Sequence, residues 1–231
     1  MWEIWSSSLP SLFGAMLKFT IPLSLLSFAI GLVIAVVVAL IKFLPVQGNR
    51  FIKLLWQGIR LLVSFYVWAF RSTPLLVQLF IIFFGLPSIG IKLAPFTAAV
   101  IGFSLNTGAY GSETIRSALL AVNQDQWDAA YTLGFSTPQT LWRIIMPQAL
   151  RIVLPPLSNE FIGLVKDTSL ASTITIAEMF QVSQQIAAQN FQPLTMYIEV
   201  AFLYAILCTI LSTLQHYLER RSSKFVQEVS H

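Results

Sequence analysis

Four ionisable side chains lie inside long apolar stretches of this sequence, and these are the residues best placed to do chemistry. They are Arg71, Glu160, Lys166 and Asp167. A charged side chain at the centre of a bilayer costs at least about 2.5–3.5 kcal/mol, so each should face protein or water and have a partner. Glu160 and Asp167 share one stripe of a helix, on which Gly163 opens room. Lys166 projects about 100° away from Asp167.

These groups suit a zwitterionic ligand such as an amino acid. Its ammonium group needs an anion or an acceptor, which Glu160 or Asp167 could supply, and its carboxylate needs a cation or free N–H groups, which Lys166 or Arg71 could supply. A helix break at Thr73-Pro74 could offer freed backbone groups, as discontinuous helices do in transporters. In the alternative interpretation, Lys166 and Asp167 form a structural ion pair, and Arg71 clamps two helices or reaches an interface.

The composition places these residues in an integral membrane protein. The 231 residues are 56% hydrophobic and 10% charged, and the mean hydropathy is +0.73. Soluble domains are about a quarter charged. Period-two alternation is absent, which argues against an outer-membrane barrel. The net charge of +4 does not indicate nucleic acid, because basic residues in a membrane chain report orientation first.

Hydropathy predicts an all-α domain covering residues 1–231, with five membrane spans. We expect the spans at about 19–41, 54–86, 96–116, 152–170 and 194–214. The second is longer than one crossing requires, and Pro74 predicts a kink at residues 71–74.

The basic residues predict the orientation of the chain. With the N-terminus outside and the C-terminus in the cytoplasm, most of them fall inside, as the positive-inside rule requires. The inside set is Lys42, Arg50, Lys53, Arg116, Arg143, Arg151, Arg220, Arg221 and Lys224. The least hydrophobic segment, residues 123–147, is then cytoplasmic.

The sequence of that segment predicts two short helices joined at a sharp corner. Asp125 is a candidate N-cap, and Gly134 suits the left-handed position just after a helix. Ser136 and Gln139 fit a capping box at the start of the second helix, expected over residues 138–145. Alanines at 129 and 130 predict a low-relief face against which another surface could pack. An ordinary helical hairpin is the alternative.

The spacing within this segment resembles a family signature. Asp128-Ala129-Ala130, then Gly134, then Ile144-x-Met146-Pro147 is similar to the loop of ABC importer permeases, which reads Glu-Ala-Ala, three residues, Gly, nine residues, Ile-x-Leu-Pro. Asp128 replaces Glu and Met146 replaces Leu. In that family the loop is a coupling helix that docks into a cytoplasmic ATPase. The resemblance therefore assigns ATPase coupling to Asp128, Ala129, Ala130 and Gly134.

Three further stretches resemble the polar amino acid subfamily: "FRSTPLLVQLF" (residues 70–80), "SLNTGAYGSE" (104–113) and "LPPLSNEFIGLVKDTSLAS" (154–172). The third is most similar to cystine-uptake members, and arginine-, histidine- and glutamine-type permeases share much of it. Glu160, where cystine-type relatives can carry a small polar residue, would suit a cationic substrate. The resemblance implies a substrate site half-way across the membrane, lined by segments 70–80 and 154–172. The site residues that we assign are Arg71, Thr73, Glu160, Lys166, Asp167 and Ser169.

The resemblance also implies a type I importer fold and a set of partners in the bacterial inner membrane. These are two cytoplasmic ATP-binding subunits, a second permease chain (identical or a close paralogue), an extracellular or periplasmic amino acid-binding protein, and membrane lipid. ATP and Mg²⁺ belong to the partner subunits, because this sequence has no G-x-x-x-x-G-K-[ST] phosphate loop. We expect no catalytic residue, metal ligand or cofactor in this chain.

Two other function classes fit the sequence less well. A stand-alone ion-gradient transporter or channel is disfavoured by the lack of internal repeats and by the docking loop. A membrane enzyme needs a catalytic constellation. His216, His231 and Cys208 are isolated and show no metal-ligand spacing.

Overall fold

The computed structural model describes residues 2–44 and 48–227, and the regular elements in these ranges are helices. The N-terminal part is one continuous helical run of α1 (Trp2–Ala15), η1 (Met16–Thr20) and α2 (Ile21–Phe43). This run extends well before the span expected at 19–41. His231, and the side chains of Arg221 and Lys224, lie outside the described residues.

The second apolar stretch is divided at Thr73 and Pro74. Helix α3 (Arg50–Ser72) ends there, and α4 (Leu75–Phe80), η2 (Ile81–Gly85) and η3 (Leu86–Ile89) follow. Both Thr73 and Pro74 have extended backbone conformations. The chain therefore breaks at this point instead of bending as one helix, since proline cannot donate the hydrogen bond that would continue it.

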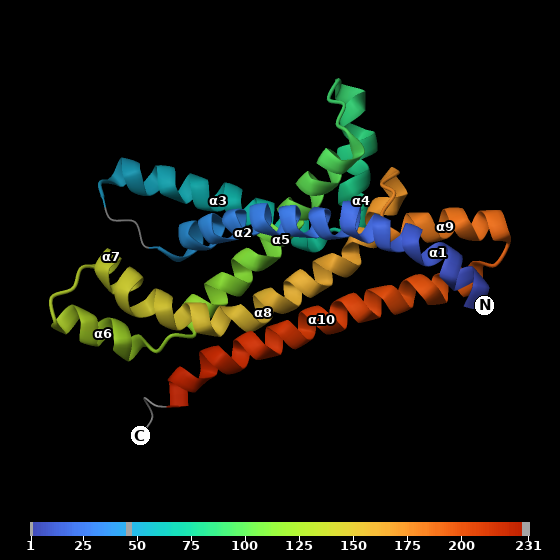
Figure 1. Ribbon diagram of the computed structural model, residues 1–231. Coiled ribbons are helices and arrows are strands. Elements are labelled where there is room, and N and C mark those ends of the chain that lie inside the picture. Colours follow the sequence, from blue (N-terminus) through green and yellow to red (C-terminus); the bar gives the residue numbers. More distant parts are fainter. Residues whose placement is uncertain (1, 45–47, 228–231) are drawn as a thin grey trace.

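The remaining long helices are α5 (Pro95–Leu120), α8 (Met146–Asp167) with η5 (Thr168–Ile174), α9 (Met179–Asn190) and α10 (Pro193–Gln227). Helices α5 and α8 pack against α2, whereas α10 packs against α8 and α9 (Figure 1). Figure 1 shows α6 and α7 at one end of the molecule, beside the start of α3, and α1 and α9 at the other.

Three helical stretches in the described chain are long and apolar enough to cross a membrane: Ile4–Phe43, Arg50–Ser72 and Pro193–Tyr217. Helices α5 and α8 are long but more polar, because they carry the residues of the candidate site. The count of five spans stays a prediction.

Small residues bring α2 and α5 into close contact. A Cβ atom on Gly108 of α5 would lie 2.6 Å from Ile34 Cγ2, and one on Gly31 of α2 would lie 2.8 Å from Thr107 Cβ. Neither position has room for a side chain, so glycine permits the approach. This tight contact fixes the face of α5 that carries Thr107.

Polar contacts join three helices at the end of the molecule that carries α6. Glu113 on α5 pairs with Lys42 on α2 and with Arg116, whose Nε lies 2.9 Å from Glu113 Oε2. Arg60 on α3 donates to the carbonyl of Ile41 at 3.1 Å, near the C-terminus of α2. A guanidinium group satisfies helix-terminal carbonyls well, so α3 and α5 are both anchored to the end of α2.

Candidate functional site: a cavity at a helix break and a capped hairpin

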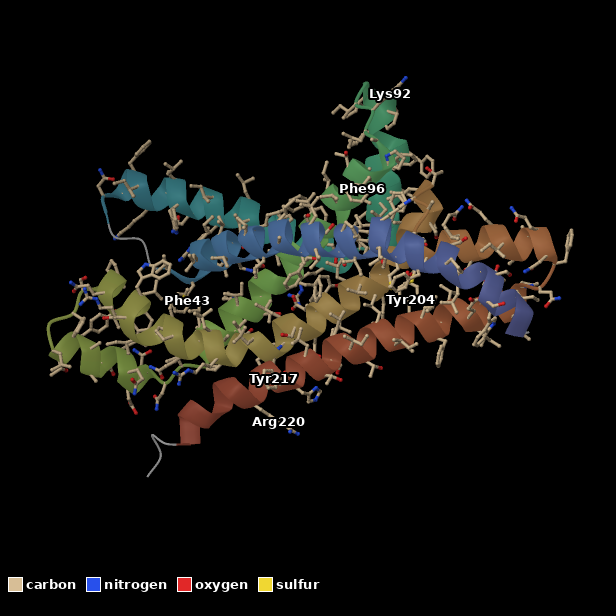
Figure 2. All side chains as sticks on the ribbon, in the orientation of Figure 1. Phe43, Lys92, Phe96, Tyr204, Tyr217 and Arg220 are labelled. Carbon is tan, nitrogen blue, oxygen red and sulfur yellow. The ribbon has the colours of Figure 1, made fainter. Side chains whose placement is uncertain are left out.

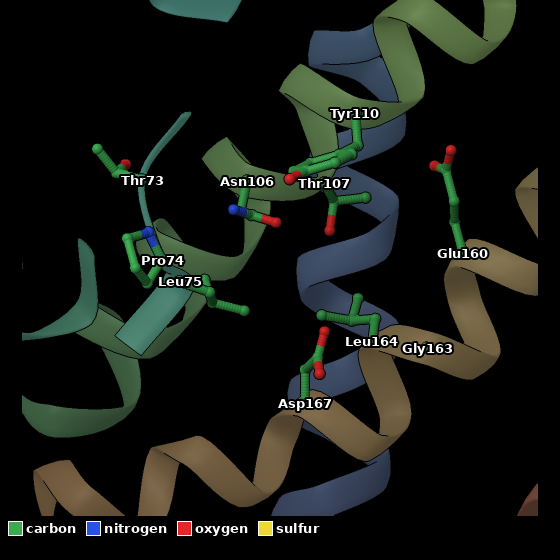
Figure 3. Close-up of a pocket in the computed structure, with 10 residues that line it drawn as sticks. All are labelled: Thr73, Pro74, Leu75, Asn106, Thr107, Tyr110, Glu160, Gly163, Leu164 and Asp167. Carbon is green, nitrogen blue, oxygen red and sulfur yellow. The ribbon is translucent and has the colours of Figure 1, made fainter. Parts of the chain in front are cut away.

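A cavity of about 340 Å³ lies where the break between α3 and α4 faces α5 and α8 (Figure 3). This volume is within the range of small-molecule sites, about 300–1,000 Å³. Its lining residues are Thr73, Pro74, Leu75, Asn106, Thr107, Tyr110, Glu160, Gly163, Leu164 and Asp167. The two segments expected to line a substrate site, 70–80 and 154–172, therefore both contribute, and α5 supplies a third wall.

Helix α8 forms the acidic wall of the cavity. Glu160 and Asp167 both line it, and Gly163 between them leaves the space open, since a Cβ there would meet nothing within 4 Å. Seven residues of helix separate positions 160 and 167 by about 10 Å along the axis. In Figure 3 the Asp167 carboxyl group points into the space between α8 and α5.

The Glu160 carboxyl group keeps an unused acceptor. Its Oε1 accepts a hydrogen bond from the Thr114 hydroxyl, but its Oε2 has no partner among the described residues. Oε2 is shielded from solvent and lies against Gly111, where a Cβ would come within 3.3 Å of it. A buried acceptor without a donor is costly, and because Oε2 is shielded, a ligand reaches it only after the carboxyl group turns toward the cavity.

The other predicted site residues lie around the cavity and are absent from its lining. The Arg71 guanidinium stands 5.4 Å from the centre of the Tyr110 ring, and Tyr110 is a lining residue. Ser169 donates its hydroxyl to the Lys166 carbonyl at 2.8 Å. Lys166 and Asp167 form no ion pair in the described part of the chain. The assignment of Arg71, Lys166 and Ser169 to the substrate remains a prediction.

The α5 wall was not assigned from the sequence. Asn106, Thr107 and Tyr110 all line the cavity. In the sequence, segment 104–113 stands out only by its similarity to relatives. Its polar residues at 106 and 110 lie one helical turn apart, which is a signal that they share a face.

The second candidate site is the hairpin of α6 (Gln124–Thr132), α7 (Thr137–Thr140) and η4 (Leu141–Ile145). The cap of α6 is Asn123, whose side chain accepts from the Asp125 amide at 3.1 Å. The expectation that Asp125 is the N-cap was wrong, because the helix begins earlier and Asp125 lies in its first turn. The capping box of Ser136 and Gln139 is present.

Gly134 makes the corner of the hairpin. Its φ is +81°. The amide of Gly134 donates to the Tyr131 carbonyl at 3.0 Å, and the amide of Phe135 donates to the Ala130 carbonyl at 3.1 Å. This pattern closes a helix with a left-handed residue, which glycine adopts without steric cost.

The two alanines of the hairpin face different ways. Ala130 is 1% exposed, whereas Asp128 and Ala129 are exposed. The expected low-relief face of both alanines is therefore wrong for Ala130, which faces the interior. The outer surface also carries Leu133, which is 76% exposed. Trp127 packs on Phe43 (labelled in Figure 2) with ring centres 6.1 Å apart, which joins α6 to the end of α2.

A cavity with two acidic lining residues at a helix break within an apolar bundle is the arrangement expected of a membrane transport subunit. Comparison with solved structures agrees. A crystal structure of an amino acid ABC transporter with histidines matches with a TM-score of 0.85 and 31% identity, over 94% of this chain and 96% of that chain. A structure of the MetNI methionine ABC transporter in an inward-facing conformation matches with a TM-score of 0.72, over 91% of this chain and 95% of that chain. Because the two sequences are only 20% identical, this second match supports the fold and nothing further.

The chain belongs to the family of binding-protein-dependent transport system inner membrane components, whose model matches residues 58–224. It is 47% identical to the L-cystine transport system permease protein TcyB of Bacillus subtilis, over 97% of this chain and 92% of that protein. It is 37% identical to the glutamine transport system permease protein GlnP of Escherichia coli, over 88% of this chain and 90% of that protein. The chain is an amino acid ABC transporter permease, a transport component rather than an enzyme. The family implies ATP-binding subunits and a binding protein as partners.

Proposed function

We propose that this chain is the membrane-spanning subunit of an importer that carries a polar amino acid inward across the bacterial cytoplasmic membrane by ATP-driven alternating access. The observation that carries this is the cavity at the helix break, which the side chains of Glu160 and Asp167 line. A carboxyl group is the kind of acceptor that a substrate ammonium group needs. The N-terminus is outside and the C-terminus is cytoplasmic, as the basic residues predict.

The substrate is a molecule with two cationic groups. Glu160 and Asp167 lie about 10 Å apart along α8, and each can hold one. L-Cystine has two ammonium groups, and L-arginine has a guanidinium and an ammonium group, whereas L-glutamine has a single cationic group. The 47% identity with a cystine permease favours L-cystine first and L-arginine next.

Import depends on partner chains. Two cytoplasmic ATP-binding subunits hold ATP and Mg²⁺ and drive the cycle. A second permease chain, identical or a close paralogue, completes the pathway. An external amino acid-binding protein delivers the substrate.

Direct binding tests the substrate assignment. Radiolabelled L-cystine, L-arginine and L-glutamine would each be titrated against the purified complex of permease and ATP-binding subunits, without binding protein. We expect L-cystine or L-arginine to bind at least tenfold more tightly than L-glutamine, because a second carboxyl group contributes a further charged hydrogen bond. Tighter binding of L-glutamine would contradict the pairing of two cations with two carboxyl groups.

The hairpin is the contact for the ATP-binding subunit. Leu133 is the most exposed large side chain on it, at 76%. Burying a leucine side chain contributes about 1.5–3 kcal/mol, so Leu133→Asp should weaken association with the ATP-binding subunit about tenfold or more. Titration of labelled ATP-binding subunit into nanodiscs that hold the permease would measure this. Leu133→Met, which keeps the apolar area, serves as the matched control. Equal affinity of both variants would place the contact elsewhere.

A further inference from the structure

The helix break at Pro74 leaves a backbone carbonyl without its usual donor. In a continuous helix the Phe70 carbonyl would accept from the amide of residue 74, but proline has no N–H. The side chain of Gln78 replaces that donor. Its Nε2 lies 2.8 Å from the Phe70 carbonyl oxygen and 3.0 Å from the Thr73 carbonyl oxygen. Gln78 is 6% exposed and does not line the cavity, so it acts behind the wall.

These contacts fix the orientation of the Gln78 amide. Carbonyl oxygens can only accept, so the nitrogen of Gln78 must face the break and its oxygen must face away. The Gln78 Oε1 then accepts from Asn106 Nδ2 on α5, at 2.9 Å. The same logic now fixes Asn106, because its nitrogen must face Gln78. In Figure 3 the Asn106 nitrogen points to the side of Thr73, and its oxygen points to the opposite side.

The Thr73 hydroxyl is fixed in the same way. Its hydrogen is donated to the Ala69 carbonyl at 2.8 Å, and its oxygen accepts from Gln78 Nε2 at 2.9 Å. Thr73 lines the cavity but has no hydrogen left to donate there. Toward a ligand, the Thr73 hydroxyl can therefore act only as an acceptor.

We propose that Gln78 is a positioning residue that caps the helix break and sets the polarity of the cavity wall. By holding Asn106 and Thr73, it turns their oxygens into acceptors for the N–H groups of a substrate cation. Together with the carboxyl groups of Glu160 and Asp167, these acceptors make the cavity selective for ammonium or guanidinium groups. This inference rests on the proposed function, in which the cavity holds an amino acid.

Gln78→Leu tests the positioning role. The variant keeps the side-chain size but loses the donor and the acceptor, so the Asn106 amide is free to turn. We expect binding of radiolabelled L-arginine or L-cystine to the complex of permease and ATP-binding subunits to weaken about tenfold. Gln215 offers a matched control. It is 7% exposed, and its Nε2 donates to the Asn159 side chain at 3.2 Å, outside the lining of this cavity. Gln215→Leu should leave the affinity unchanged.

Asn106→Asp distinguishes a positioning role of Gln78 from a role in stability alone. We expect its effect on substrate affinity to have opposite signs with Gln and with Leu at position 78. With Gln78 present, one Asp oxygen faces Gln78 Oε1 and repels it, so binding should weaken even though the cavity gains negative charge. In the Gln78→Leu background the carboxylate presents an oxygen to the cavity in either orientation, so Asn106→Asp should restore part of the lost affinity. A loss of packing alone would not produce this reversal.

These experiments distinguish a failure of the positioning role from a failure of the proposed function. Unchanged binding in Gln78→Leu, or a gain of affinity in Asn106→Asp alone, overturns the positioning role while the proposed function stands. If Gln78→Leu fails to assemble with the ATP-binding subunits, Asn106→Asp alone still decides, since it leaves the Phe70 carbonyl capped. A wild-type complex that binds neither L-arginine nor L-cystine contradicts the proposed function and, with it, this inference.

Discussion

Replacement of Glu160 by Gln should weaken amino acid binding by about tenfold to a hundredfold while the complex of permease and ATP-binding subunits assembles normally. The reason is that Glu160 lines the cavity and supplies one of its two carboxyl groups. A hydrogen bond to a charged group contributes about 1.5–3 kcal/mol, and Gln keeps the shape but not the charge. Titration of radiolabelled L-cystine and L-arginine against the purified complex measures the effect.

Glu199 supplies a matched control for that experiment. It is 2% exposed, its Oε2 accepts from the Ser8 hydroxyl at 2.6 Å, and its Oε1 has no partner among the described residues. Its environment thus parallels that of Glu160, but it lies on α10 and does not line the cavity. Glu199→Gln should bind substrate as the wild type does. Equal losses in both variants, or none in Glu160→Gln, would remove Glu160 from the site.

Replacement of Gly134 by Val should abolish substrate-stimulated ATP hydrolysis while substrate binding stays within about twofold of wild type. At φ +81° a side chain meets no neighbour within 4 Å, so the effect is conformational. The left-handed region costs about 1–2 kcal/mol per residue for ordinary amino acids, and most for β-branched ones. The corner between α6 and α7 would open and misplace the exposed surface that carries Asp128 and Ala129. ATPase assays in liposomes, with and without loaded binding protein, measure the loss.

Two control variants test whether the effect of Gly134→Val comes from backbone strain at the corner of the hairpin. Gly134→Asn should keep most of the stimulation, because asparagine tolerates left-handed geometry. Gly90 has φ +87° and also no neighbour within 4 Å, but it follows η3, away from the hairpin. Gly90→Val should therefore leave ATPase stimulation intact. If Gly134→Val lost substrate binding together with stimulation, the hairpin would be a support for the fold and not a coupling element.

Features with a local cause could be predicted from the sequence. Pro74 lacks an amide hydrogen, so an interruption of the helix near residues 71–74 was predictable, whereas its extent was not, since α8 continues through Pro155 and Pro156. Gly134 follows a short capped helix, and its left-handed conformation was expected. The class of protein was likewise predictable, because apolar length and the spacing from Asp128 to Pro147 depend only on the order of residues.

Features that depend on packing could not be predicted in the same way. The helix continues through α1 although the sequence there is more polar, because Leu12 is buried in a cluster with Ala187 of α9 and Met196 of α10. The inward face of Ala130 depends on how α6 docks. The link from Gln78 to Asn106 joins two helices whose residues lie 28 positions apart, and no local pattern records that contact.

Uptake into liposomes tests ATP-driven import most directly. The chain would be reconstituted alone, and together with its ATP-binding subunit and binding protein, and supplied with radiolabelled L-cystine, L-arginine or L-glutamine. We expect accumulation of L-cystine or L-arginine only when all three proteins and ATP are present, together with substrate-stimulated ATP hydrolysis. Accumulation of substrate by the purified chain alone, without ATP, would contradict this function and indicate a stand-alone transporter or channel.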